Sequence, residues 1–162
     1  MPSLHVQASA YPLTSVEPAS ETVVIVLDTN VLSELLRSSP DPGVIAWVAS
    51  RPLATLFTTT VTQAEMLYGA RVLPSGQRRS QLESAMSGLF EEDFSGRILS
   101  FDSAAASFYA EIAASRRRAG RAVSQFDAQI AAITMACGGE LATRNVSDFV
   151  ETGVRVVDPW SG

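Results

Sequence analysis

The amino-acid sequence predicts an α/β fold, a three-layer α/β/α sandwich with a mainly parallel central sheet. Short runs rich in β-branched and apolar residues alternate with longer helical segments after residue 22, and this alternation is typical of parallel sheets covered by helices on both faces. The first run, Val23–Leu27, is apolar at every position, as expected of a strand buried on both faces. A chain of 162 residues suits one domain with a sizeable core.

The first half of the chain alternates between predicted helices and two predicted strands. A helix over Thr29–Arg37 follows the first strand and ends before Pro40–Gly43, because two prolines and a glycine form a turn there. A second break at Pro74–Gly76 separates two further helices. The remaining elements of this half are helices at Val44–Ser50, Thr62–Val72 and Gln77–Phe94 and a threonine-rich strand at Leu56–Thr60.

The second half continues the alternation with three short strands. Arg97–Phe101 is predicted to be a strand, and Asp102 is placed to cap a long alanine-rich helix that ends at Gly120, since Asp favours helix N-caps and Gly favours helix ends. Another helix is predicted over Ser124–Cys137, which Gly138-Gly139 ends. The last strands are predicted at Glu140–Thr143 and Val154–Val157.

The segment before the first strand has a different composition. Residues 1–22 contain three prolines and no basic side chain except His5, so we expect a loosely ordered extension, or a start codon assigned too far upstream. Because no positively charged start precedes an apolar core, no secretory signal is expected. The domain itself is expected to span residues 23–160. No apolar run approaches the roughly 20 residues that cross a bilayer, and we expect a cytoplasmic protein without a membrane partner.

The composition excludes several kinds of active site. All 12 basic residues are arginine, so a Schiff-base lysine and a phosphate-binding Walker-A lysine are excluded. The single histidine, His5, and the single cysteine, Cys137, argue against a Ser-His-Asp triad, a His/Cys zinc site and an internal disulfide. Carboxylates, hydroxyls, amides and arginines remain, and they favour hard, oxygen-ligated cations such as Mg²⁺ or Mn²⁺. A net charge of −5 argues against a protein that coats nucleic acid.

Four acidic residues are expected near one edge of the sheet. Asp28 directly follows the first strand and has no evident capping role, and Asp148 lies just past the strand at Glu140–Thr143. Glu65 and Asp127 lie near the starts of two helices. Since ligands of such sheets bind beyond the carboxyl ends of the strands, we expect the four carboxylates to converge there.

Each of these acids, taken singly, also has a structural interpretation. Thr62–Glu65 and Ser124–Asp127 fit the capping-box pattern or an Asp variant of it, and Asp148 suits a turn or cap. Asp102 is better explained as a helix cap than as a member of the acidic group. Capping and metal binding are compatible, because a carboxylate has two oxygens, and the convergence of four acids favours a joint function.

Several motifs occur in an order that resembles a known family. They are Asp28–Leu32, Glu65 early in its helix, Asp127 within Phe126–Ala132, Leu141–Phe149 and the closing Val157–Trp160. Together they resemble the PIN-domain ribonucleases, and among these the VapC toxins of bacterial type II toxin–antitoxin modules in their FitB-like branch. The resemblance extends over roughly Val24–Trp160, and it implies a PIN-like fold for the predicted domain.

The resemblance implies an Mg²⁺- or Mn²⁺-dependent endoribonuclease. By position, Asp28, Glu65, Asp127 and Asp148 would form its acidic site. Asp28, Asp127 and Asp148 would be the metal ligands, and Glu65 would act directly or through a water. Clustered carboxylates repel one another unless a cation neutralises them, and a bound cation can activate a water for attack on a phosphodiester.

The resemblance also extends to substrate and partners. Asn30 and Thr143 would orient ligands or substrate, and Arg144, next to the acidic site, would bind RNA phosphate. A toxin of this kind forms a homodimer and is inhibited by a cognate VapB-type antitoxin whose C-terminal segment occupies the active-site groove.

The sequence is also compatible with two other functions, and it leaves two roles for a basic cluster. A non-catalytic PIN-fold module for binding or dimerisation is the first alternative. An aspartyl-phosphate phosphotransferase is the second, although it would have an Asp where Asn30 stands and would use a lysine. The basic cluster Arg116–Arg118 with Arg121 is either a solvated helix end or a track for RNA phosphates.

Overall fold

Five parallel strands form the central sheet in this computed structural model, which describes residues 23–162. Their spatial order is β3-β2-β1-β4-β5, so the first strand lies in the middle. Val26 of β1 is paired in register with Phe57 of one neighbouring strand, β2, and with Leu141 of the other, β4. The strands are β1 (Ile25–Leu27), β2 (Leu56–Thr59), β3 (Ile98–Leu99), β4 (Glu140–Ala142) and β5 (Arg155–Val157). The expected extension over residues 1–22 lies outside the described residues.

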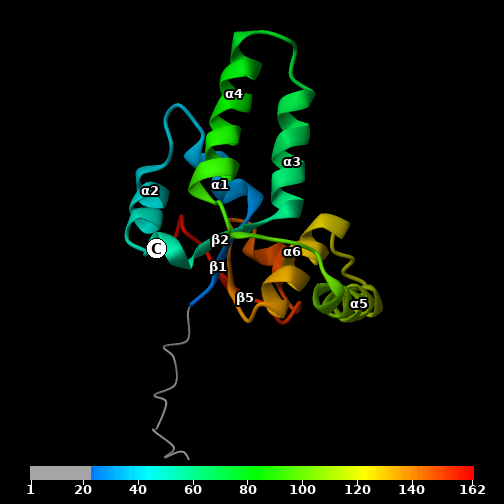
Figure 1. Cartoon of the computed structure of the whole chain (residues 1–162). Coiled ribbons are helices and arrows are strands. Elements are labelled where there is room, and N and C mark those ends of the chain that lie inside the picture. Colours follow the sequence, from blue (N-terminus) through cyan, green and yellow to red (C-terminus); the bar gives the residue numbers. More distant parts are fainter. Residues whose placement is uncertain (1–22) are drawn as a thin grey trace, which may run out of the picture.

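Helices cover both faces of the sheet, which confirms the predicted three-layer α/β/α architecture. In Figure 1, α3 and α4 form an antiparallel pair that rises from the sheet, and α5 and α6 lie together at the opposite side. The helices are α1 (Thr29–Leu35), α2 (Pro42–Ala49), α3 (Thr60–Arg71), α4 (Gln77–Ser87), α5 (Ser103–Arg118) and α6 (Gln125–Ala136). Short helical turns are η1 (Leu53–Thr55), η2 (Gly88–Asp93) and η3 (Val146–Phe149).

The central strand β1 divides the core into two parts. Ile25 and Leu27 pack against α1 to α4, whereas Val26 packs against α5 and α6, because successive side chains of a strand point to opposite faces. All three are at most 6% exposed. The continuous apolar run at the start of the domain is therefore a strand buried on both faces, as predicted.

The helix starts agree with the prediction at two caps and disagree at one. Asp102 Oδ1 accepts from Ala105 N at 2.9 Å and Ser124 Oγ accepts from Asp127 N at 3.1 Å, so both act as N-caps. The predicted capping box at Thr62 is wrong, because α3 begins earlier and Thr59 Oγ1 accepts from Thr62 N at 3.0 Å. This shift puts Glu65 in the second turn of α3, where its carboxylate is free of a capping role.

The helix predicted over Gln77–Phe94 has nearly its expected length but changes type after Ser87. It ends as α4 at Ser87 and continues as the π-helical turn η2, in which Phe94 N donates to Leu89 O at 2.9 Å across five residues. The wider turn buries Leu89, Phe90 and Phe94 together in the core shared with β1. Across residues 23–162, no helix is long and apolar enough to span a bilayer.

Candidate active site

Asp28 lies at the carboxyl end of the central strand and is 4% exposed. Its Oδ1 accepts from Thr29 N at 2.8 Å, which makes Asp28 the N-cap of α1. The expectation that Asp28 has no capping role is therefore wrong. Its second oxygen, Oδ2, accepts from the Thr143 hydroxyl at 2.7 Å and from Asn30 Nδ2 at 3.3 Å. One carboxylate thus caps a helix with one oxygen and binds two side chains with the other.

Thr143 is the centre of a hydrogen-bond network that joins the ends of β1 and β4. Its hydroxyl donates to Asp28 and accepts from Asn30 Nδ2 and from Asn145 N, each at 3.1 Å, so all of its hydrogen-bonding capacity is used. Asn30 Oδ1 in turn accepts from Arg144 N at 3.2 Å. The side chains of Asn30 and Thr143 therefore hold the acidic residue and the loop after β4 together.

Glu65 reaches the same edge of the sheet from α3. The Thr29 hydroxyl donates to Glu65 Oε1 at 3.0 Å, and the Thr62 hydroxyl lies 3.1 Å from the Thr29 hydroxyl. Because Thr29 directly follows Asp28, this bond couples the first turn of α1 to the second turn of α3. It brings the two carboxylates predicted from distant parts of the chain to neighbouring positions.

Asp127 of α6 and Asp148 of η3 complete the acidic group. Asp127 is half-buried in the first turn of α6, whereas Asp148 is exposed on η3. Repulsion from Asp148 helps to raise the pKa of both Asp28 and Asp127, so the three carboxylates lie close enough to interact. All four acids that the sequence predicted for the site are gathered at the carboxyl edge of the sheet.

The raised pKa values of three of these acids have a common cause. Burial raises the pKa of Asp28, of Glu65 and of Asp127, because desolvation disfavours the charged form. The neighbouring carboxylates add to this rise in pKa, while hydroxyl and backbone donors such as Thr143 oppose it at Asp28. Such a group of mutually repelling, partly buried carboxylates is stabilised by a cation.

The donor set fits a hydrated divalent ion better than a closed metal cage. Within residues 23–162, no three acidic, histidine or cysteine side chains stand close enough to hold a metal ion by themselves. Mg²⁺ keeps several waters and is usually bound through only one or two carboxylates. Carboxylates that bind an ion partly through intervening waters would match this preference.

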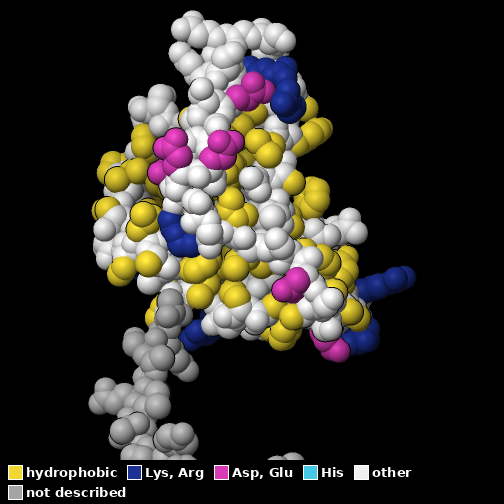
Figure 2. All heavy atoms as spheres, in the orientation of Figure 1, with side chains coloured by type: hydrophobic (Ala, Val, Ile, Leu, Met, Phe, Trp, Pro, Cys, Tyr) yellow, Lys and Arg dark blue, Asp and Glu magenta, His cyan; other side chains and the backbone are white. Residues whose placement is uncertain are grey.

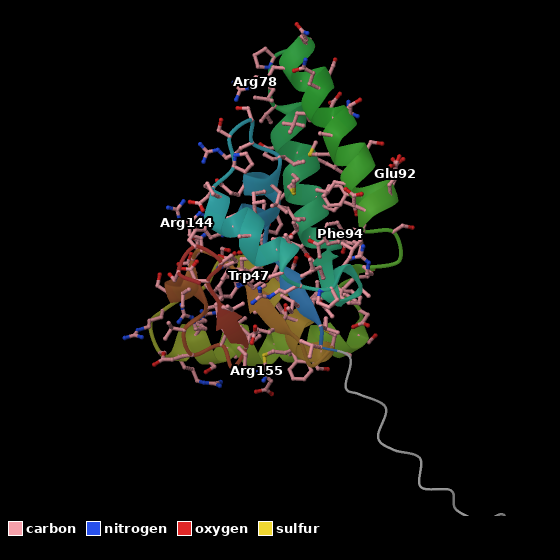
Figure 3. The ribbon with its side chains drawn as sticks, turned by 90° about the vertical axis from the view of Figure 1, so that its left-hand side faces the viewer. Trp47, Arg78, Glu92, Phe94, Arg144 and Arg155 are labelled. Atoms are coloured by element: carbon pink, nitrogen blue, oxygen red, sulfur yellow. The ribbon has the colours of Figure 1, made fainter. Side chains whose placement is uncertain are left out.

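A groove adjoins the acidic site. It has a volume of about 670 Å³ and lies between α1, α3 and α4, with Thr29 and Glu65 at its inner end. Its wall combines apolar side chains, such as Met66 and Leu82, with polar and charged ones that include Arg37 and Arg78. Figure 3 shows Arg78 near the far end of the α3–α4 pair, so a chain lying in this groove would run from the acidic site towards these helix tips.

Arg144 lies beside the acidic site, as its sequence position suggested. It is exposed, its backbone N–H binds Asn30, and its guanidinium carbon lies 5.1 Å from the centre of the Trp160 ring. Figure 3 shows Arg144 at the edge of the molecule, on the same side as Arg78. The sequence did not predict the contact with Trp160. Trp160 belongs to the closing Val157–Trp160 motif, but that motif gives no information about its partner.

The basic cluster at the end of α5 does not act as one unit. Arg117 and Arg118 are exposed, but Arg116 is 7% exposed and donates through Nη1 to Val150 O at 2.6 Å. Arg121 forms an exposed ion pair with Glu151, in which Nη1 lies 3.6 Å from Oε2. Neither a solvated helix end nor an RNA-phosphate track describes Arg116, because its side chain points into the protein.

Comparisons with known proteins agree with this fold. The model of the PIN domain family matches residues 25–153. The VapC ribonuclease Y4jK of Sinorhizobium fredii is 36% identical over 137 residues, which are 85% of this chain and 98% of that protein. The toxin FitB of Neisseria gonorrhoeae is 34% identical over 137 residues, 85% of this chain and 99% of that protein. The crystal structure of FitAcB from the same organism superposes with a TM-score of 0.76 at 33% identity, covering 85% of this chain and 99% of that one.

Proposed function

Because this chain belongs to the PIN-domain family, we propose that it is an Mg²⁺- or Mn²⁺-dependent endoribonuclease and the toxin of a type II toxin–antitoxin pair. The observation that carries the proposal is the position of Asp28. Its carboxylate is buried at the carboxyl end of the central strand, and its pKa is raised by burial and then by repulsion from Asp127 and Asp148. The names of the relatives, a VapC ribonuclease and a toxin, support the reaction and its biological role.

The proposed metal ligands are Asp28, Asp127 and Asp148, and Glu65 joins them directly or through a water. Because no three acids of the described chain are close enough to hold an ion by themselves, part of this proposed binding runs through waters on the ion. When bound, a divalent cation lowers the pKa of a water and stabilises the charge that develops on the phosphodiester. The surrounding residues set the direction of the carboxylates. Thr143 and Asn30 hold Oδ2 of Asp28, and such outer partners commonly control metal affinity.

Glu65 is also proposed to hold a proton during the reaction. Burial raises its pKa above the ordinary value, with Asp28 and Asp127 contributing further, and a raised pKa improves a carboxyl group as a general acid or base near neutral pH. The Thr29 hydroxyl fixes Oε1 of Glu65 and leaves Oε2 free to face water or substrate.

Arg144 is the proposed contact to RNA phosphate. Its exposed guanidinium lies over Trp160 beside the loop after β4, and an arginine can grip a phosphate through two parallel hydrogen bonds. Asn30 and Thr143, expected to bind substrate, use their polar atoms for Asp28 and for the loop. Their proposed contribution to substrate binding therefore acts through the position of Arg144 and Asp28.

The proposed partners are a cognate antitoxin, RNA and a second copy of this chain, in the cytoplasm. The groove between α1, α3 and α4 leads away from Glu65, so an antitoxin segment in it would also cover the acidic site. On α3, Leu67, Tyr68 and Val72 are 45%, 70% and 61% exposed, and Figure 2 shows apolar side chains along this edge of the molecule. Light scattering of the purified chain measures the proposed dimer directly.

The test of the proposed function is cleavage of RNA by the full chain. Purified protein is expected to cut single-stranded RNA with Mg²⁺ or Mn²⁺ and to lose this activity with EDTA. Expression without the antitoxin is expected to arrest growth, and Asp28→Asn is expected to abolish both effects. Absence of metal-dependent cleavage, together with unchanged growth arrest by Asp28→Asn, would overturn the proposal.

A non-catalytic PIN-fold module remains the second candidate because of one observation. No three acids of the described chain are close enough to hold a bare metal ion. A module that only binds a partner would not need a metal ion at this position. Calorimetric titration with Mn²⁺ separates the two candidates. A nuclease is expected to bind Mn²⁺ and to lose this binding with Asp28→Asn, whereas the non-catalytic module is expected to bind none.

A further inference from the structure

Arg116 is a buried arginine that has no role in the proposed acidic site or in the proposed contact to RNA. It occupies the last turn of α5 and is 7% exposed, whereas the adjacent Arg117 and Arg118 are exposed. Among residues 23–162, no carboxylate lies within ion-pair distance of it, and its Nε is buried without a hydrogen-bond partner. The carbonyl end of α5 offsets part of this charge, but a buried and unpaired charge still costs stability.

Within residues 23–162, the one hydrogen bond of the Arg116 side chain goes to the segment that carries Asp148. Nη1 donates to Val150 O at 2.6 Å, across 34 residues of sequence. Val150 directly follows η3, the short helical turn that contains Asp148, and it lies two residues beyond Asp148. Arg116 therefore fixes the backbone exit of this turn from inside the protein.

The other contacts of this segment explain why such a support matters. The turn has only four residues, and Asp148 N donates to Asn145 O at 3.0 Å. After Val150, Glu151 has a φ of 62°, a left-handed conformation that is strained for a residue other than glycine. The ion pair of Glu151 with Arg121 is exposed on both sides, and exposed pairs contribute little.

We propose that Arg116 is a positioning residue for the acidic site, which holds the Val150 carbonyl and thereby keeps Asp148 directed towards Asp28 and Asp127. This inference rests on the proposed role of Asp148 as a metal ligand. Burial of the guanidinium destabilises the fold, but its hydrogen bond restrains the short, exposed turn that carries Asp148. Loss of an outer support of this kind commonly weakens metal binding by about 10-fold or more.

The experiment compares Arg116→Gln with Arg117→Gln, which removes the same charge from the exposed neighbour. For each full-length variant, the Mn²⁺ dissociation constant is measured by calorimetry, and kcat and KM are measured with an RNA oligonucleotide. Arg116→Gln is expected to raise the dissociation constant about 10-fold and to lower kcat with little change in KM. Arg117→Gln is expected to stay within about twofold of the parent chain. Equal values for the two variants would overturn the proposal.

A double-mutant cycle with Asp148→Asn separates positioning from a general structural role. If Arg116 acts through Asp148, Arg116→Gln in the Asp148→Asn background is expected to weaken Mn²⁺ binding less than about twofold, because the two changes are coupled. A full additional 10-fold loss in that background would contradict the proposal. Arg116→Lys, which retains the charge and an N–H donor group but not the planar guanidinium, is expected to fold and to give an intermediate dissociation constant even if Arg116→Gln does not fold.

Failure of the proposed function leaves this inference testable. If the protein binds Mn²⁺ but cuts no RNA, the nuclease proposal fails and the binding constants still judge Arg116. If it binds no Mn²⁺, amide hydrogen exchange of the apo chain is the deciding measurement. The amides of Asp148 and Thr152, which bond to Asn145 O and Phe149 O, are expected to exchange faster in Arg116→Lys than in Arg117→Gln. Equal exchange rates would overturn the proposal.

Discussion

The hydroxyl of Thr143 donates to Oδ2 of Asp28 at 2.7 Å and joins two parts of the chain that are 115 residues apart. Both residues directly follow strands, β4 and β1, which pair with each other in the sheet. Asp28 N also donates to Ala142 O at 2.9 Å, so the sheet ladder itself sets the spacing of the two side chains. The buried carboxylate is therefore held by main-chain geometry as well as by its side-chain partner.

Replacing this hydroxyl is expected to weaken the site without unfolding the domain. Thr143→Val keeps the shape of the side chain but removes the donor to Asp28 and the acceptor of Asn30 and Asn145. We expect a drop of about 10-fold in Mn²⁺ affinity or in kcat. Thr143→Ser retains the hydroxyl and is the matched control, and it is expected to keep most of both values. Equal activity of the Val and Ser variants would contradict this role.

Removing the charge of Asp28 is expected to abolish metal binding and catalysis. Asp28→Asn leaves a side chain of the same size at the buried end of β1, but the amide is a much poorer ligand for a hard cation. We expect RNA cleavage to fall by at least about 100-fold, because loss of the bound cation removes the charge stabilisation of the transition state. The exposed acid Asp93 provides a control, and Asp93→Asn is expected to keep full activity.

The pH dependence of stability follows from the raised pKa of Glu65. Burial, with smaller contributions from Asp28 and Asp127, raises this pKa in the folded chain, so the folded state binds the proton more tightly than the unfolded state. The stability contributed by the protonated group is complete below the unfolded pKa and is lost as the pH rises through the folded pKa.

Glu65→Gln is therefore expected to raise the melting temperature of the metal-free chain near pH 7, by no more than about 2 °C because the group is only half-buried. The amide still accepts from Thr29 through Oε1. Below about pH 4, where the carboxyl is protonated in both states, the variant and the parent are expected to melt together. Glu91→Gln, at an exposed position, is the control, and an equal rise in that variant would refute the explanation.

Arg144 is expected to affect substrate binding more than chemistry. Arg144→Ala removes an exposed guanidinium from the residue that directly follows Thr143, and a lost phosphate contact should raise KM for RNA several-fold and reduce the dependence of binding on salt. The exposed Arg155, in β5, is the control, and Arg155→Ala is expected to change KM little. Fluorescence anisotropy with labelled RNA at two salt concentrations measures both effects.

The order of helices and strands and the location of the acids were predictable because they depend on local patterns. A fully apolar run such as Val23–Leu27 predicts a doubly buried strand, and Asp28 after it must lie at the carboxyl edge of a parallel sheet. Asp102 could be identified as a cap because it directly precedes a long alanine-rich helix. These inferences need only the residues of one element and its neighbours.

Choices among adjacent, chemically similar residues were not predictable. Thr59, rather than Thr62, caps α3, and the threonine-rich sequence offers several suitable hydroxyls within one turn. Arg116 is buried, while the identical Arg117 and Arg118 are exposed. The helical rotation that turns Arg116 inward depends on how α5 packs against α6 and on where the chain places the Val150 carbonyl, which a run of three arginines does not reveal.

By itself, the sequence determined the α/β alternation, the central buried strand and the set of carboxylates at one edge of the sheet. The tertiary structure alone decided which partner holds each carboxylate: Thr143 for Asp28 and Thr29 for Glu65. It also decided the spacing of the acids and the inward direction of Arg116. The physical reason is that these contacts join residues 34 to 115 positions apart, so their distances follow from the packing of whole elements rather than from local residue patterns.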